Sequence, residues 1–263
     1  MPGHLLGSMV VCHDISLLQC TIRTGHAGYW SYDQHSVGHS SNKMEGMVSR
    51  VTSTNSRKAP GERRDEIIAE AARLAVTAGL EKITLRAVAA GIDVRPGLIS
   101  HYFPTVEDLL VVACERALSD ERTRLIPAEG APLTRLARMI ARLEGGHADD
   151  LARLWLNARH LSRHHPRLGE ALVAQEEQDR ERLMGLIRDG IAEGAFPAQD
   201  PFAACVRIFV AVDGAGAYVN SPTPFDHVTY HRFITDVAQW ALGITDDSLR
   251  QAVDCATAEL IRP

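Results

Sequence analysis

The chain has 263 residues, of which 45% are hydrophobic and 23% are charged. This composition supports a packed core and excludes a wholly disordered polymer. No apolar run approaches the roughly 20 residues that a membrane span needs, so we expect no membrane partner. The net charge of −5 argues against a nucleic-acid partner only if the charge is spread evenly along the chain. Five scattered cysteines predict reduced thiols and a cytoplasmic protein.

Residues 1–56 mix Gly, Ser, His, Thr and Asn and follow neither a helical nor a strand period. We therefore expect them to form a disordered extension. Met44 and Met47 leave open a translation start closer to the first ordered residue. Metal binding by Cys12 and Cys20 is an alternative, but their spacing is not that of a zinc finger. We expect no cofactor and no metal.

Almost everything after Gly61 has the three- and four-residue apolar spacing of amphipathic helices. The first helix ends before Gly79. A second helix over 85–90 begins after the N-cap Thr84, and a third runs from about 95 to 102. Further helices are expected at 106–124, 132–145, 148–164, 167–194, 201–219, 226–243 and 246–261. No segment alternates as a strand does, so the sequence predicts an all-α fold.

The stretch 84–103 has the proportions of a helix-turn-helix, whose second helix enters the DNA major groove. Four apolar side chains would hold this unit together: Val88, Val94, Ile99 and Phe103. The residues left facing outward are Arg95, Pro96, Gly97, Leu98, Ser100 and His101. Small residues permit close backbone approach, the arginine can reach phosphate or guanine, and the leucine can touch a thymine methyl. The sequence therefore predicts a DNA-reading helix.

The pattern of residues 63–118 is RRDEIIAEAARLAVTAGLEKITLRAVAAGIDVRPGLISHYFPTVEDLLVVACERAL. It resembles the DNA-binding domain of the TetR family, and the run GLISHYF is similar to the branch typified by choline-responsive BetI repressors. The resemblance implies a helix-turn-helix domain over 57–105 and an effector-binding and dimerisation bundle over 106–263, connected by helix 106–124. It also implies these DNA-binding residues: Thr84, Arg86, Arg95, Pro96, Gly97, Leu98, Ser100, His101 and Tyr102.

Three residues depart from the family pattern. Asp93 replaces the turn glycine, and aspartate adopts a left-handed conformation less readily than glycine does. Arg95 replaces a Ser or Thr ahead of the recognition helix, which removes a cap and adds a cation. Val106 replaces a lysine that grips phosphate. At least one family contact to DNA is therefore missing.

Helices 201–219 and 226–243 carry apolar faces that would pack against a second subunit as a four-helix interface. Their apolar residues are Phe202, Val206, Phe209, Val210, Val212, Ala217, Phe233, Val237 and Trp240. A ligand pocket is expected where polar and aromatic side chains interrupt apolar helices. The effector-binding candidates are Met139, Trp155, Asn157, Arg159, His160, Met184, Asp213 and Tyr218. The charged run 176–182 is expected to be an exposed helix face.

These features predict a homodimeric repressor that a small-molecule effector of unknown identity releases from palindromic double-stranded DNA. No enzyme motif is present, so we expect no catalysis. The alternative is a helical interaction or scaffold module that has lost specific DNA binding. Residues 57–103 hold eight Arg or Lys against six Asp or Glu, an excess of +2, whereas residues 104–263 hold 17 against 24, a deficit of −7. The acidity therefore belongs to the rear of the chain.

Overall fold

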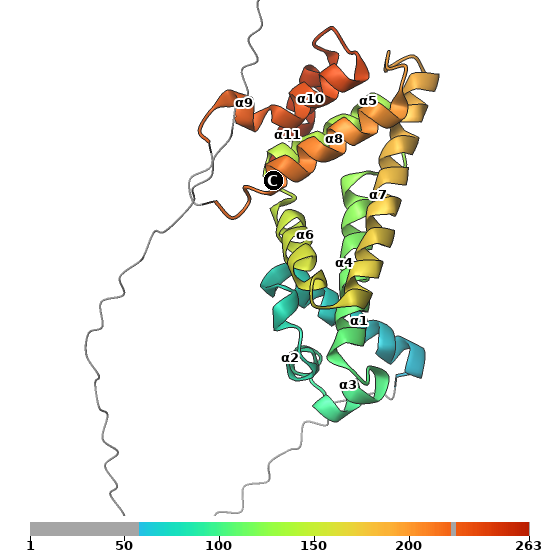
Figure 1. Cartoon of the computed structure of the whole chain (residues 1–263), viewed down its shortest axis with the longest axis vertical. Coiled ribbons are helices and arrows are strands. Elements are labelled where there is room, and N and C mark those ends of the chain that lie inside the picture. The colour runs from blue at the N-terminus through green and yellow to red at the C-terminus, as the bar shows by residue number, and fades with distance from the viewer. Residues whose placement is uncertain (1–57, 222–224, 263) are drawn as a thin grey trace, which may run out of the picture. The chain divides into compact units, whose positions relative to one another are not determined.

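Figure 1 shows a computed structural model of the protein, which describes residues 58–221 and 225–262. In these two ranges the chain forms eleven α-helices and one short 3-10 helix and has no strand, which confirms the all-α prediction. The extension predicted for residues 1–56 lies outside the described residues, as do Cys12 and Cys20. No helix within the described ranges combines the length and the apolar character needed to cross a membrane.

Within the described ranges the helices follow one another without intervening strands. They are α1 (Pro60–Ala78), η1 (Leu80–Lys82), α2 (Leu85–Gly91), α3 (Pro96–Tyr102), α4 (Val106–Leu125), α5 (Pro132–Glu144), α6 (Asp149–Ser162), α7 (Pro166–Ala192), α8 (Pro201–Gly216), α9 (Val228–His231), α10 (Phe233–Leu242) and α11 (Ser248–Ile261). Proline occupies the first turn of α1, α3, α5, α7 and α8, where its missing N–H has no intrahelical partner to lose.

Two expected helices differ from the structure. The helix predicted over 226–243 is two helices, because Arg232 leaves the helical region (φ −116°, ψ 15°) and donates its N–H to the carbonyls of Val228 and Tyr230. The helix predicted over 201–219 ends at Gly216 and continues only as turns. Glycine has low helix propensity, which favours this earlier end.

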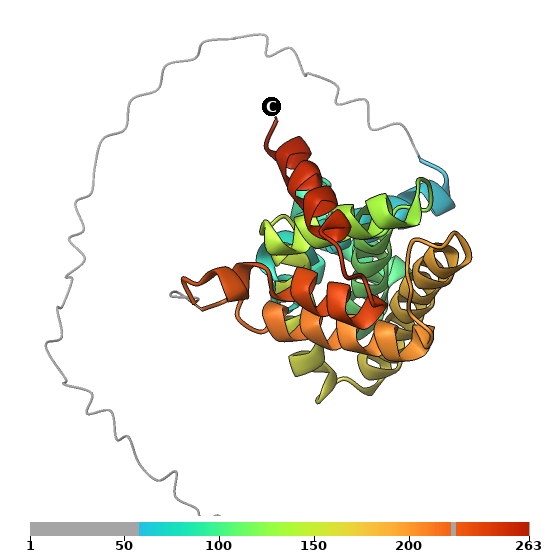
Figure 2. The same ribbon diagram turned by 90° about the horizontal axis from the view of Figure 1, so that it is seen from above.

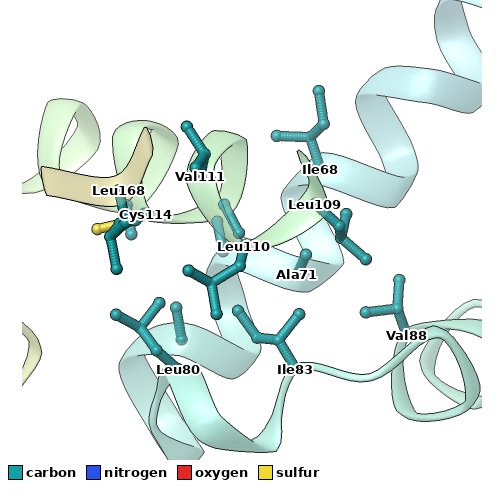
Figure 3. Packing of buried hydrophobic residues seen from close by; sticks show 14 of the residues in the cluster. Ile68, Ala71, Leu80, Ile83, Val88, Leu109, Leu110, Val111, Cys114 and Leu168 are labelled. Carbon is teal, nitrogen blue, oxygen red and sulfur yellow. The ribbon is translucent and has the colours of Figure 1, made fainter. Parts of the chain in front are cut away.

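The first hydrophobic core joins α1, α2, α3 and α4 to parts of α6 and α7. Figure 3 shows Ile68 and Ala71 of α1 gathered near Leu109 and Cys114 of α4, with Leu168 of α7 close by. Leu154 and Ala158 of α6 belong to the same buried cluster. The helices expected to read DNA therefore share their core with helices of the rear of the chain.

The second hydrophobic core lies among α5, α7, α8, α10 and α11. Figure 2 shows α10 running beside α8 and α11 lying against α5, and both pairs are in contact. Phe196 follows α7 and is 2% exposed. It packs so closely on Gly190 that a Cβ at that glycine would lie 2.1 Å from the ring. Gly190 therefore permits the turn between α7 and α8 to fold back on the helix.

Candidate DNA-binding surface and ligand cavity

Helices α2 and α3 are joined by a tight turn. The Thr84 hydroxyl caps α2 by accepting a hydrogen bond from the N–H of Ala87 at 3.0 Å. Asp93 has a φ of 53°, in the left-handed region, and the N–H of Val94 closes the turn on the Ala89 carbonyl at 2.9 Å. The two short helices and this turn form a helix-turn-helix. Asp93 thus adopts the conformation for which the family uses glycine.

The inward and outward faces of this unit follow the expected division. Val88, Ile99 and Phe103 are buried and Val94 is half-buried. The predicted DNA-binding residues are exposed at Thr84, Arg86, Arg95, Pro96, Gly97, Ser100 and His101, and half-buried at Leu98 and Tyr102. Leu98, expected to face outward, is therefore partly covered. A Cβ at Gly97 would meet nothing within 4 Å, so the surface above the first turn of α3 is open.

Arg86 and Arg95 are the two arginines of this surface. Among the residues that the structure describes, no carboxylate forms a salt bridge with Arg86 or Arg95. By contrast, Arg63 and Lys58 at the start of α1 both pair with Glu66 at 2.6 Å. A cation without a carboxylate partner loses no ion pair when it binds DNA, which favours a phosphate or base contact.

The start of α4 lies next in the chain. Thr105 and Asp108 form a capping box, in which the Thr105 hydroxyl accepts the Asp108 N–H at 3.1 Å. Arg167 at the start of α7 donates to the same Asp108 carboxylate, and hydrogen bonds from Arg167 and Thr105 lower the pKa of Asp108. Val106 is 43% exposed, at the position where the family has its lysine. This helix end is therefore fixed to α7 but presents no cation of its own.

The sequence profile described as "Bacterial regulatory proteins, tetR family" matches residues 67–113. This match spans most of α1, all of α2 and α3, and the first part of α4. The chain carries a TetR-family N-terminal domain. Among curated proteins no sequence matches the chain.

Solved structures of TetR-type regulators share this fold. A TetR transcription regulator from Haloarcula marismortui is 17% identical, with a TM-score of 0.54, covering 70% of this chain and 97% of its own. A proposed transcriptional regulator from Saccharomonospora viridis, solved with choline, is 20% identical, with a TM-score of 0.53 and coverages of 67% and 95%. FadR from Bacillus subtilis, solved with stearoyl-CoA, is 21% identical, with a TM-score of 0.50 and coverages of 68% and 97%. At these identities the likeness concerns the fold.

A cavity of about 420 Å³ lies among helices α4 to α8 and the segment that leads to α10. Its wall is mainly aliphatic and aromatic, as is typical of small-molecule sites. Five of the effector-binding candidates line it: Met139, Trp155, Arg159, Asp213 and Tyr218. The structure thus brings together residues that are up to 79 positions apart in the sequence.

Three candidates lie outside the cavity wall. Asn157 is two positions from Trp155 on α6, about 200° around the helix, and its Oδ1 accepts a hydrogen bond from the N–H of Leu80 at 2.8 Å. His160 is exposed, and Met184 is buried in the second hydrophobic core. Of each helix, only the side chains on one face reach the cavity. In the described ranges no group of His, Cys, Asp and Glu could hold a metal ion.

The cavity also contains an arginine that the sequence interpretation missed. Arg122 of α4 is 8% exposed and lies on the wall. It donates to Asp179, to Gln178 at 2.9 Å and to the Gln175 side chain at 2.6 Å. Burial raises the pKa of Asp179, although the hydrogen bond from Arg122 opposes that shift. The run 176–182, expected to be an exposed face, therefore places the half-buried Asp179 on the cavity wall.

Arg159 of α6 makes a second ion-pair group at the cavity. Its Nη2 lies 3.0 Å from Asp213 and 3.1 Å from Glu176, and its guanidinium lies over the Trp155 ring at 5.1 Å. Burial lowers the pKa of Arg159, but its bonds to Asp213 and Glu176 outweigh burial and raise it. Both arginines of the wall are thus held by carboxylates of α7 or α8.

Glu144, the last residue of α5, is a further lining residue that the sequence interpretation missed. Its Oε1 accepts the N–H of Thr235 at 2.8 Å, and its Oε2 accepts the Thr235 hydroxyl at 2.7 Å. It thereby caps the first turn of α10 from a position 91 residues earlier. Burial raises the pKa of Glu144, and the two bonds from Thr235 oppose the shift.

The outer faces of α8 and α10 are apolar and exposed. The exposed residues are Phe202, Val206 and Val210 of α8 and Phe233 and Trp240 of α10. Arg207 lies over the Trp240 ring at 4.5 Å. Phe209 and Val212, which the prediction assigned to the same apolar faces, line the cavity instead. The two helices therefore have one face toward the cavity and one toward solvent.

Proposed function

We propose that the protein is a homodimeric transcriptional regulator that represses by binding a palindromic operator and releases it when a small molecule occupies the cavity. The observation that carries the proposal is the TetR-family helix-turn-helix, whose α3 has an exposed outer face. Arg95, the N-cap of α3, has no salt bridge to any residue that the structure describes. This chemistry is that of a major-groove reader. The run GLISHYF is similar to the BetI-like branch, which supports a recognition helix related to that of BetI-like repressors. Membership of that branch stays a prediction.

The exposed apolar faces of α8 and α10 support dimer formation. Five large apolar side chains are more than 40% exposed on these two adjacent helices, a pattern that marks a protein interface. Two helices from each subunit would form a symmetric four-helix contact. A two-fold dimer places two copies of α3 on two half-sites, which explains why the operator should be palindromic.

The cavity supports the ligand-responsive part of the proposal. Two structures with this fold contain choline and stearoyl-CoA. In this chain α4 contributes Leu118 and Arg122 to the cavity wall and Leu109 to the first core. Helix α6 contributes Trp155 and Arg159 to the wall, while its Asn157 holds the backbone just before α2. A ligand that favours one position of these helices thereby changes the placement of the reading head.

The rival proposal is a helical scaffold that does not bind DNA specifically. Selection of duplexes from a random library by the purified protein separates the two. A regulator enriches a palindrome whose half-sites lie about one helical turn apart, and its affinity falls steeply with salt. Enrichment of no sequence above the starting library would favour the scaffold. We propose no enzymatic activity, in keeping with the TetR-family domain.

A further inference from the structure

The charges on the cavity wall do not balance. Two arginines, Arg122 and Arg159, share the wall with His231 and with four carboxylates, those of Glu144, Asp149, Asp179 and Asp213. His231 lies 3.9 Å from Asp226, a carboxylate outside the wall. Asp179 is paired with Arg122, and Asp213 with Arg159, which also meets Glu176. The arginines are therefore neutralised by their own carboxylates, and the wall keeps an excess of negative charge.

Glu144 is a lining carboxylate that pairs with neither Arg122 nor Arg159. Asp149 lies 3.7 Å from Arg153, whereas Glu144 has no salt bridge to any Arg, Lys or His of the part of the chain that the structure describes. It stands at the C-terminal end of α5, whose dipole adds negative potential, and it caps the first turn of α10, whose dipole opposes that potential.

Each carboxylate oxygen of Glu144 accepts one bond from Thr235, and the nearby charge of Arg232 and the Ile234 backbone also oppose the rise that burial causes in the pKa of this carboxyl. Arg232 itself forms its salt bridge with Asp254, so the carboxylate keeps acceptor capacity for a further cation.

Aromatic rings line the same cavity. Trp155, Phe209, Tyr218 and Tyr230 contribute to the wall, and the rings of Tyr218 and Tyr230 meet edge to face with centroids 5.9 Å apart. Ring faces attract organic cations, and rings with aliphatic neighbours accommodate an apolar body. The volume of about 420 Å³ lies within the range of small-molecule sites.

We propose that the cavity binds an organic cation with an apolar body and that the Glu144 carboxylate is the counter-ion of its charged group. The inference rests on the proposed function only in naming this ligand the effector. A cation beside Glu144 gains an ion pair and relieves the cost of a half-buried carboxylate that has no salt bridge within the described ranges. The wall is less suited to a carboxylate or phosphate, because Arg122 already donates to Asp179, Gln178 and Gln175.

Calorimetric titration of the full chain with three probes of one chain length tests the proposal. The probes are decyltrimethylammonium, 1-decanol and decanoate, each below its aggregation concentration. They share an apolar body and differ in the charge of the head group. We expect the cation to bind about 10-fold more tightly than the alcohol, and decanoate to bind more weakly than either. Equal affinity for the three probes, tighter binding of decanoate, or no binding of the cation would overturn the proposal.

The variant Glu144→Gln keeps the shape of the side chain and an acceptor for the Thr235 N–H. It should weaken binding of the cation about 10-fold and leave binding of decanol unchanged. Glu129→Gln removes the same charge from an exposed residue outside the cavity and should change neither affinity. Cation binding that is unaffected in Glu144→Gln contradicts the role of this carboxylate. Because the titration contains no DNA, its failure leaves operator binding intact, and a failure of operator binding leaves the charge preference of the cavity intact.

Discussion

At the scale of single residues, Asp93 carries backbone strain at the turn between α2 and α3. Its φ of 53° is a conformation that glycine adopts without the steric cost of a Cβ. We expect Asp93→Gly to raise the free energy of unfolding by about 0.5–1 kcal/mol in a urea titration. Ala90→Gly, in the neighbouring helix α2, is the matched control and should lower it by about 1 kcal/mol. A loss of stability in Asp93→Gly would contradict the strain.

Glu144 gives the stability a pH dependence of defined sign. Burial raises its pKa above the ordinary value of 4.5, so the folded protein binds this proton more tightly than the unfolded chain does. The stabilisation that this proton contributes is complete below the pKa of Glu144 in the unfolded chain. It is lost as the pH rises through the pKa of Glu144 in the folded protein. Relative to wild type, Glu144→Gln should therefore become more stable between pH 4 and pH 7, as measured by urea unfolding at each pH. A relative stability that falls over this range would mean that the folded pKa is lowered.

At the scale of helices, α6 connects the cavity to the helix-turn-helix. Asn157 lies two residues beyond Trp155 and accepts a hydrogen bond from the N–H of Leu80. Leu80 lies four residues before Thr84, the cap of α2. We expect Asn157→Leu to reduce about 3- to 10-fold the effect of decyltrimethylammonium on DNA affinity. The cation and the DNA should each bind with wild-type affinity when the other is absent, because Asn157 touches neither the cavity nor the outer face of α3.

Asn157→Asp keeps the acceptor for the Leu80 N–H and is the matched control. It should retain the coupling between cavity and DNA. Fluorescence anisotropy of a labelled duplex, titrated with and without the cation, measures both quantities. If Asn157→Leu and wild type respond equally to the cation, this bond does not transmit the change.

How far the sequence predicts these helices depends on the range of the interactions that form them. The helix-turn-helix was predictable because its apolar spacing and the Thr84 cap act over a few residues. The helix break at Arg232 and the burial of Arg122 were not predictable in this way. Arg122 is satisfied by residues 53 to 57 positions away, and the cap of α10 comes from Glu144, 91 positions away. In the sequence such residues look like ordinary surface charges, and only tertiary packing distinguishes them.

At the scale of the whole molecule, the apolar outer faces of α8 and α10 should determine the oligomeric state. Trp240 is 66% exposed there, and a charge at its position would face the partner subunit. We expect Trp240→Glu to sediment as a monomer where wild type is a dimer, and to bind the selected operator at least about 100-fold more weakly. Val173→Glu places the same charge on an apolar residue of α7 that is 69% exposed, and it should remain a dimer. A dimeric Trp240→Glu would place the interface elsewhere.

The central claim is that the outer face of α3 reads DNA, and a salt series with one double variant tests it most directly. Fluorescence anisotropy measures the affinity of wild type and of Arg95→Ala/His101→Ala for the selected palindrome between roughly 50 and 200 mM salt, a range over which phosphate contacts change the affinity by orders of magnitude. We expect the double variant to bind at least about 10-fold more weakly and to lose about two units of the logarithmic salt slope, one for the Arg95 of each subunit. Unchanged affinity and slope, in a variant with the wild-type unfolding curve, would contradict the claim.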